Sequence, residues 1–181
     1  GILFDNWITD AAGRARQVIR SGYQNPITEI PTGAISVGDR LYAWFMSVNW
    51  WGPPGEWTLR YAGLAYSDDE GEHFTIVNGF RLPATTNFGM VAASTRTDLP
   101  AGSDEHIYVW GTPSGRQGSV KLARVLPANI ENPAAYEYYG GLSNGLPFWT
   151  ISESAAMKVV PATVGEMSVM YNPAARRWTM L

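Results

Sequence analysis

The chain has 181 residues and a formal net charge of -3. It has no cysteine and only two histidines, which excludes a disulfide scaffold, a thiol nucleophile and an ordinary zinc site. The charge gives no electrostatic basis for nucleic-acid binding, and no apolar run reaches the ~18 residues that a membrane-spanning helix needs. With 19 glycines, 12 prolines and 13% aromatic residues, the composition predicts a turn-rich, mostly β protein.

Residues 1–26 are expected to form a helix and loop segment ahead of the strands. Within it, residues 10–20 predict a short helix, with Asp10 as the N-cap and Gly22 as the stop. The N-terminus has no basic segment followed by an apolar one, so either the protein lacks a signal peptide or this chain begins after it. Short helical turns are expected at residues 127–136 and 152–159.

The strands that follow fall into similar groups, each with a turn ahead of an aromatic strand. Two groups of four strands and a third group cut off after its second strand predict β-propeller blades at about 33–78, 88–140 and 165–181. A β-sandwich with the same strand count is the alternative. The predicted strands are residues 34–37, 40–48, 59–66, 74–77, 88–94, 106–111, 119–125, 136–139, 166–171 and 177–181.

Residues 67–74, Ser-Asp-Asp-Glu-Gly-Glu-His-Phe, fit the Asp-box pattern S-x-D-x-G-x-x-[WF]. Such a box is a hairpin turn, in which Ser67 and Asp69 bond the backbone, Gly71 takes a positive φ and Phe74 packs underneath. We interpret these four residues as structural. The neighbouring carboxylates lack EF-hand spacing, so no metal or other cofactor is expected, although looser calcium binding stays open.

Residues 80–83, Phe-Arg-Leu-Pro, look like the substrate-carboxylate motif of sialidases. In sialidases that motif precedes the first Asp-box, whereas here it follows one. The arginine triad and the nucleophilic tyrosine of sialidases are not identifiable. We therefore interpret Arg81 as a surface residue beside a strand end.

Two carboxylates precede predicted inner strands, and in a propeller such strands begin at one end of the central channel. Glu29 lies ahead of the first group and Glu166 lies where the third begins. Together they could form the acid/base pair of a glycoside hydrolase, which needs a spacing of about 5–5.5 Å for retention or about 6.5–9.5 Å for inversion. The alternative for each is a solvated acid or a turn cap. Asp5, beside Trp7, is a further acidic candidate.

A loop predicted over residues 49–57 contains Trp50, Trp51 and Trp57 among glycines and prolines. Exposed indole faces stack well on sugar rings, although at least one of these rings is expected to fold back onto the sheet. A second loop, residues 111–116, carries Arg116, whose forked donors could bond substrate hydroxyls, bond a carboxylate or tie the loop together.

Ordered motifs along nearly the whole chain resemble an actinobacterial and phage domain family of unknown function whose members include endo-D-arabinanases. The motifs are residues 30–32 (IPT), 45–48 (FMSV), 50–52 (WWG), 66–71 (YSDDEG), 87–90 (NFGM), 107–116 (IYVWGTPSGR) and 165–172 (GEMSVMYN).

The resemblance implies a five-bladed propeller that hydrolyses D-arabinofuranosyl linkages of cell-envelope polysaccharide in a secreted or wall-associated protein. The chain then corresponds to an interior piece of about half a family domain, lacking an upstream Gly-Asp-Thr motif. Glu166 and Glu29 are the expected channel carboxylates, and Trp50, Trp51, Asn87 and Arg116 are the expected sugar contacts. A non-catalytic carbohydrate-binding propeller is the alternative, and a sialidase-like enzyme comes third.

Overall fold

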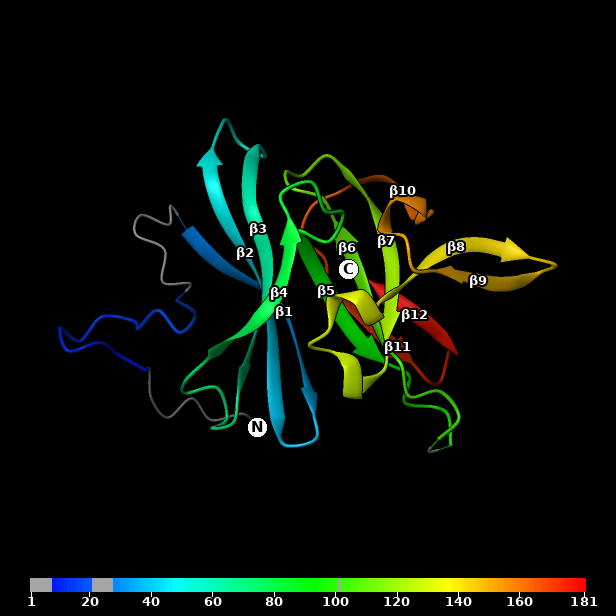
Figure 1. Cartoon of the computed structure of the whole chain (residues 1–181), viewed down its shortest axis with the longest axis horizontal. Helices are drawn as coiled ribbons and strands as arrows, with labels where there is room; N and C mark the ends of the chain where they lie inside the picture. Colours follow the sequence, from blue (N-terminus) through cyan, green and yellow to red (C-terminus); the bar gives the residue numbers. More distant parts are fainter. Residues whose placement is uncertain (1–7, 21–27, 101) are drawn as a thin grey trace.

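The computed structural model describes residues 8–20, 28–100 and 102–181, which form three antiparallel sheets. Figure 1 shows the first sheet on the left, the second beside it and the small third sheet behind. No sheet closes on itself within these residues. The first sheet has the order β1-β2-β3-β4 and comprises β1 (Thr28–Val37), β2 (Arg40–Trp51), β3 (Trp57–Ser67) and β4 (Thr75–Pro83).

The second sheet has the order β5-β6-β7-β8-β9, with β10 paired to β7. β7 is bonded by β8 at Ala123 and Arg124 and by β10 nearer its start, so two strands share one edge. Its strands are β5 (Met90–Thr95), β6 (Ile107–Thr112), β7 (Gly118–Val125), β8 (Glu137–Ser143), β9 (Leu146–Thr150) and β10 (Lys158–Val164).

The third sheet pairs β11 (Val169–Asn172) with β12 (Arg177–Met180). Three 3-10 turns lie between strands of the second sheet, inside the two stretches predicted to be helical. They are η1 (Pro127–Asn129), η2 (Pro133–Ala135) and η3 (Glu153–Ala155). The predicted all-β class is therefore confirmed for the part of the chain described. Among these residues there is also no helix with the length and apolarity to cross a bilayer.

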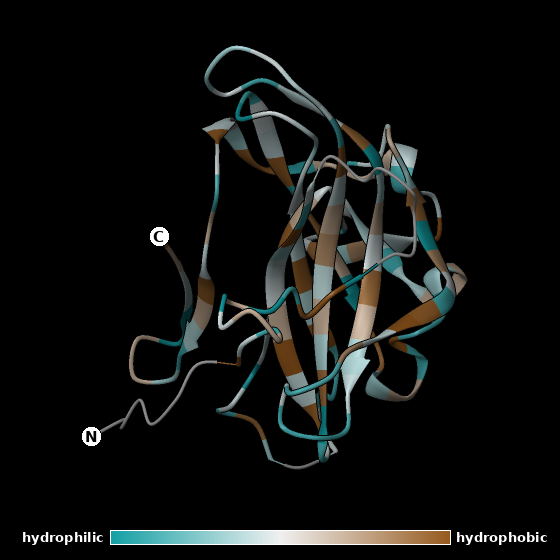
Figure 2. Ribbon diagram, turned by 90° about the vertical axis from the view of Figure 1, so that its left-hand side faces the viewer, coloured by the Kyte–Doolittle hydropathy of each residue, from teal (hydrophilic) through white to brown (hydrophobic). Residues whose placement is uncertain are grey.

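The middle of β2 is buried continuously from Tyr42 to Val48 because apolar groups cover both of its faces. On one face, Phe45 packs with Ile19 of the N-terminal segment. On the other face, Trp44 packs against the second sheet. Figure 2, which views the first sheet from outside, shows the apolar residues along the middle of its long strands.

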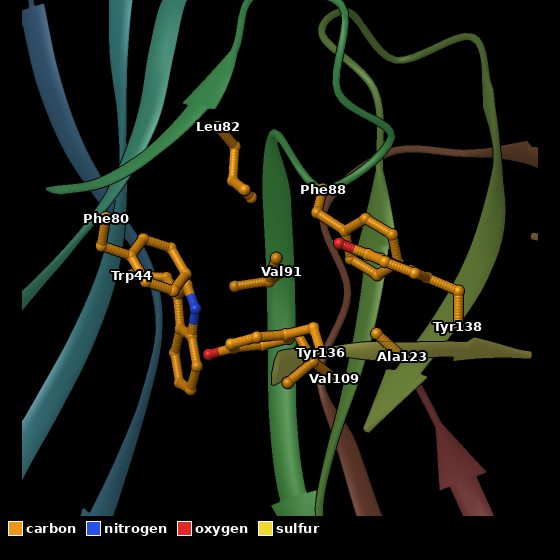
Figure 3. Close-up of a pocket in the computed structure, with 9 residues that line it drawn as sticks. All are labelled: Trp44, Phe80, Leu82, Phe88, Val91, Val109, Ala123, Tyr136 and Tyr138. Carbon is orange, nitrogen blue, oxygen red and sulfur yellow. The ribbon is translucent and has the colours of Figure 1, made fainter. Parts of the chain in front are cut away.

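The core between the first two sheets is built around aromatic side chains. The indole N–H of Trp44 bonds the Tyr136 hydroxyl, which donates to the Ile130 carbonyl at 2.8 Å. Burial raises the pKa of Tyr136 above its ordinary value. Figure 3 shows these rings around a cavity of about 10 Å³, which holds no more than one water molecule and is too small for a ligand.

A second core joins the second and third sheets. The rings of Trp110 and Trp178 meet edge to face with centroids 4.6 Å apart, and Tyr171 contacts the same Trp178 at 5.0 Å. Such aromatic pairs stabilise by about 0.5–1.5 kcal/mol beyond their buried area. The middle sheet is therefore packed on both faces.

The first strands of the three sheets lie side by side, because β5 contacts both β1 and β11. A Cβ atom on Gly33 of β1 would lie 2.6 Å from the Val91 carbonyl oxygen of β5, so the two backbones approach as only glycine permits. Thr28, Met90 and Val169, at the starts of these strands, pair with Val48, Thr112 and Met180 at the far ends of the second strands. The three sheets consequently present corresponding ends together.

The predicted helix at residues 10–20 is wrong. Asp10 accepts backbone N–H bonds from Ala12 at 2.8 Å and Arg14 at 3.0 Å, and Gly13 has a φ of 75°. A bridge between Thr9 and Ala15 closes the turn. The Asp10 side chain thus caps a local turn. Aspartate is common at helix N-caps, but the same carboxylate can instead bond the backbone of a turn, as it does here. Asp5 and Gly22 lie outside the described residues.

Two strands were missing from the prediction, and others differ in length. β9 and β10 contain Pro147 and Pro161, which depress strand patterns because proline has no N–H for the ladder. β11 begins at Val169 rather than at Glu166, which lies in the preceding bend. β2 and β3 continue to the pair Trp51–Trp57, so all three tryptophans of the predicted loop lie in strands and only residues 52–56 form the turn.

Candidate functional site

A cleft of about 350 Å³ lies at the end of the molecule where β1 and β5 begin. The Thr32 hydroxyl accepts the Val91 N–H at 3.4 Å, which ties β1 to β5 beside it. Methionine side chains from three segments form much of the wall, and one carboxylate, Glu166, is present. The lining residues are Ile30, Pro31, Thr32, Met46, Met90, Val91, Glu166 and Met167.

Glu166 forms an ion pair with Arg116 at 2.5 Å between Oε1 and Nη2. Both side chains are largely exposed, at 74% for Glu166 and 54% for Arg116, so the pair can exchange partners with a ligand. Gly165 lies beside the arginine stem, where a Cβ would be in ordinary contact with the Arg116 side chain at 3.5 Å. The carboxylate is therefore held at the cleft by an exposed cation.

The β2–β3 hairpin places two tryptophans on the surface and one inside. Trp50 is 48% exposed and Trp51 44% exposed, whereas Trp57 is buried against Leu59 and Met90. The Trp51 indole N–H donates to the Thr28 hydroxyl at 3.1 Å, and its ring lies 5.8 Å from that of Trp57. This hairpin end, residues 50–57, which we call the tryptophan hairpin, thus carries two exposed indole rings, and that of Trp51 is held in place.

Arg116 connects the tryptophan hairpin to the cleft. Its backbone N–H donates to the Gly55 carbonyl at 3.0 Å, and its guanidinium carbon lies 5.9 Å from the centre of the Trp57 ring. Because the same guanidinium holds Glu166 and the Trp57 ring contacts that of Trp51, a chain of contacts links Trp51 through Trp57 and Arg116 to the cleft. Arg116, Trp51 and Glu166 were all predicted as site residues, and the structure brings them together.

Glu29 lies on the other face of the first sheet. It pairs across the ladder with Ser47, next to buried Phe45, and accepts a bond from the Gln17 amide at 3.3 Å. The adjacent Ile30 faces the cleft, and neighbouring strand residues point to opposite faces. The two carboxylates predicted as an acid/base pair are therefore not brought together.

Asn87 is engaged inside the molecule. Its backbone N–H and its side-chain amide donate to Glu153 at 2.7 and 3.0 Å. The buried Thr86 hydroxyl donates to the same carboxylate at 3.1 Å. Sequence reasoning missed Glu153, since a lone acid at the start of a short 3-10 turn carries no distinguishing pattern. Asn87 remains a predicted sugar contact, although its amide already has a partner.

The Asp-box turn joins β3 to β4. The Ser67 hydroxyl donates to Asp69 at 2.7 Å, the His73 N–H donates to the same carboxylate at 2.8 Å, and Gly71 has a φ of 92°. The His73 backbone bond, followed by those of the Ser67 hydroxyl and the His73 ring, lowers the pKa of Asp69 to about 2. Phe74 packs with the cluster around Phe45. These residues shape the turn and lie on the outer face of the first sheet.

Asp69, Glu72 and His73 offer ligand atoms within 4.8 Å of one another. Arg16 donates to the Glu72 carbonyl and lies 3.3 Å from His73 Nε2, so a cation already faces this group. Positive charge at that distance opposes a metal ion. The group is better explained as the charged surface of the turn.

Arg81 of the sialidase-like motif lies on β4 with its guanidinium carbon 4.1 Å from the centre of the Tyr61 ring. Phe80 beside it is buried in the aromatic core. Phe80 and Arg81 thus point to opposite faces of β4, as neighbouring strand residues do, and both lie away from the cleft.

No curated protein matches the chain significantly. The whole sequence, residues 1–181, matches one family, described as Domain of unknown function (DUF4185). A match over the full length covers the cleft, the tryptophan hairpin and all three sheets. The chain therefore belongs to the DUF4185 domain family.

Proposed function

We propose that this chain is the polysaccharide-binding part of a β-propeller. The observation that carries the proposal is a chain of contacts from the exposed ring of Trp51, through the Trp57 ring and Arg116, to the carboxylate of Glu166 at the cleft. The family resemblance supplies the polymer, a D-arabinan of the cell envelope. A secreted or wall-associated location goes with that substrate.

The propeller architecture is supported by the inner strands. β1, β5 and β11 lie side by side, and each opens a separate antiparallel sheet. A β-sandwich has two sheets packed face to face, whereas here a middle sheet packs on two neighbours. Successive sheets whose first strands adjoin are typical of propeller blades, of which the third here has two strands.

The chemistry of the surface suits a carbohydrate. Sugar rings present apolar C–H faces that stack on indoles, and their hydroxyls need donors and acceptors at fixed positions. Arg116 supplies donors and Glu166 supplies acceptors; both are exposed, Arg116 is anchored through its N–H to the Gly55 carbonyl, and Glu166 is held by Arg116. The methionine walls of the cleft add adaptable apolar contact.

Hydrolysis of the polymer is the second candidate. Glu166, which lines the cleft, favours it, because glycoside hydrolysis requires a carboxylate at the scissile bond. Its partner would have to be an acid other than Glu29, since Glu29 faces the opposite side of the first sheet. The sialidase alternative needs three converging arginines, and no arginine is among the residues that line the described cleft.

Titration calorimetry with D-arabinan oligosaccharides tests the binding proposal. Trp51→Ala should weaken affinity about tenfold, because truncating an aromatic contact residue costs about 1–2 kcal/mol of binding energy. Glu70→Gln, at the exposed Asp-box turn, is the matched control for Glu166→Gln. Unchanged affinity in both Trp51→Ala and Glu166→Gln would exclude this surface.

Release of reducing ends from arabinan tests hydrolysis separately. Activity that Glu166→Gln abolishes and Glu29→Gln leaves intact would establish an enzyme with Glu166 as one of its carboxylates. Binding without any release of reducing ends would leave a carbohydrate-binding module.

A further inference from the structure

The β8–β9 hairpin projects from the body of the molecule (Figure 1) and has no charged residue from Tyr138 to Ser152. Its tip and the segment behind it expose large apolar side chains. Leu146 is 70% exposed and Ile151 82%. The full exposed set is Leu142, Leu146, Phe148, Ile151 and Met157, which we call the apolar hairpin. A patch of this kind marks an interaction site in a folded protein.

Backbone features hold the hairpin in one shape. Asn144 and Gly145 have φ values of 53° and 79°, which is a two-residue turn of the type favoured between antiparallel strands. A Cβ on Gly140 would lie 2.6 Å from the Phe148 ring, and one on Gly141 would lie 2.6 Å from the Met157 sulfur. The two glycines therefore let Phe148 and Met157 lie directly on the strand.

The side chains are arranged in layers along the hairpin. Leu142 and Leu146 stand next to the turn, while Tyr139 and Trp149 form an edge-to-face pair at the other end, with centroids 5.8 Å apart. The Arg124 guanidinium carbon lies 4.2 Å from the centre of the Trp149 ring. Aliphatic and aromatic groups thus follow one another, with the Arg124–Glu137 ion pair behind them, the order in which a bilayer interface accommodates aliphatic and aromatic side chains.

A lysine pair lies beside the base of the hairpin. Lys158 directly follows Met157, whose N–H donates to the Tyr139 carbonyl at 2.8 Å, and it stands opposite Lys121 in the β7–β10 ladder. Neither lysine has an ion-pair partner among the described residues. Like charges directly opposite each other destabilise a sheet, and an anion between them removes that cost.

Strand addition by a second copy of the chain is disfavoured. Leu142 pairs with Pro147, one position from the turn, so the N–H that proline lacks would face the open edge of β9. A proline on an edge strand is a common means of preventing such pairing. The convex tip instead suits a deformable apolar phase, which needs no preformed pocket.

We propose that the apolar hairpin docks this domain onto an anionic lipid surface. Leu142, Leu146 and Phe148 enter the boundary between headgroups and acyl chains, Trp149 and Tyr139 lie at headgroup level, and Lys121 and Lys158 face the lipid phosphates. The domain lies on the membrane and does not span it, since burial of a few apolar side chains plus electrostatic attraction gives reversible interfacial binding.

Sedimentation with vesicles tests the proposal on the intact chain. Vesicles of phosphatidylcholine with phosphatidylglycerol should bind the protein, and Leu142→Ser combined with Leu146→Ser should lower the bound fraction about tenfold or more, because both apolar tip contacts are lost. Met170→Ser, at a β11 residue 59% exposed and on another sheet, is the matched control and should bind as the parent does. Thermal melting should be unchanged in all variants.

The lysine pair gives an independent measurement. Lys121→Gln with Lys158→Gln should reduce binding to the anionic vesicles and leave binding to pure phosphatidylcholine unaltered. Absence of binding to anionic vesicles, or equal binding by the leucine double variant, would overturn the proposal. A concentration-dependent dimer in light scattering that the leucine variant abolishes would instead identify a second copy as the occupant.

Discussion

Two hairpins of this domain expose large apolar side chains, and their surroundings differ. At the tryptophan hairpin, Trp50 and Trp51 are exposed, and Arg116 from a neighbouring loop bonds the Gly55 carbonyl of the hairpin and the carboxylate of Glu166. At the apolar hairpin, residues 138–152 include no charge, and the tip projects from the body. Similar exposure therefore predicts different partners: a ring with hydroxyls in one case, an apolar phase in the other.

The contrast shows that the polar neighbours of an exposed aromatic residue indicate which kind of partner it binds. A donor and an acceptor within reach of an indole specify a ligand with matching groups. An aromatic layer behind aliphatic side chains indicates only how deeply the hairpin enters an apolar phase. Four experiments test this comparison.

The largest effect is expected at the buried foot of the tryptophan hairpin. Trp57→Ala should lower the free energy of unfolding by about 3–5 kcal/mol, because it leaves a cavity among Leu59, Met90 and their neighbours. Phe148→Ala, at a residue 50% exposed, should lower it by no more than about 1 kcal/mol. Chemical denaturation of both variants measures the difference. Equal losses would mean that the apolar hairpin is as much a part of the core as Trp57.

The two hairpin turns allow a matched backbone comparison. Gly55 has a φ of 87° and Gly145 a φ of 79°, so an alanine at either position should cost about 1–2 kcal/mol of stability. Only Gly55→Ala should also weaken arabinan binding, because the Gly55 carbonyl positions Arg116. Denaturation and calorimetry on the pair separate the two effects. Weaker binding in Gly145→Ala would show that the hairpins are coupled.

The Asp-box turn is a third hairpin, and in this one a carboxylate bonds the backbone of the turn. The pKa of Asp69 falls from its ordinary 3.8 to about 2 on folding, so its ionised form stabilises the fold above pH about 4. That contribution is lost as the pH falls from about 4 to about 2. Asp69→Asn should flatten this part of the dependence of melting temperature on pH. An identical acid limb in both proteins would show that the turn does not depend on the carboxylate.

The smallest effect on stability is expected at Glu166. Glu166→Gln should change the free energy of unfolding by no more than about 0.5 kcal/mol, since the pair with Arg116 is exposed on both sides. The same substitution should weaken ligand binding. Denaturation and calorimetry on one preparation give both numbers. A large loss of stability would make the ion pair a structural tie and remove it from the proposed site.

Strand periodicity predicted most of the fold because the long strands of the first two sheets bury alternating or continuous apolar residues. It could not predict β9 and β10, whose prolines disrupt the strand signal and which pair at sheet edges where proline is tolerated. The helix over residues 10–20 failed for a related reason. A capping residue such as Asp10 favours a turn as readily as a helix start, and only tertiary contacts decide between them.

The candidate site was predictable in part. The motifs around Trp51, Arg116 and Glu166 are distinctive in sequence, and the structure places them on one surface. Glu29 was not placed correctly beside Glu166, because the face to which a strand residue points depends on register, and a single position reverses it. The methionines of the cleft could not be predicted, because a methionine that lines a cleft looks the same in sequence as one buried in a core.

The turn of the apolar hairpin also contains a site of spontaneous deamidation. Asn144 is followed by Gly145, the neighbour that leaves an asparagine side chain most open to attack by the next backbone nitrogen. Deamidation there converts a neutral amide into a carboxylate at the extreme tip of a stretch that otherwise has no charge. Ageing of the protein would therefore place a negative charge between two exposed leucines, opposite to what an anionic surface accepts.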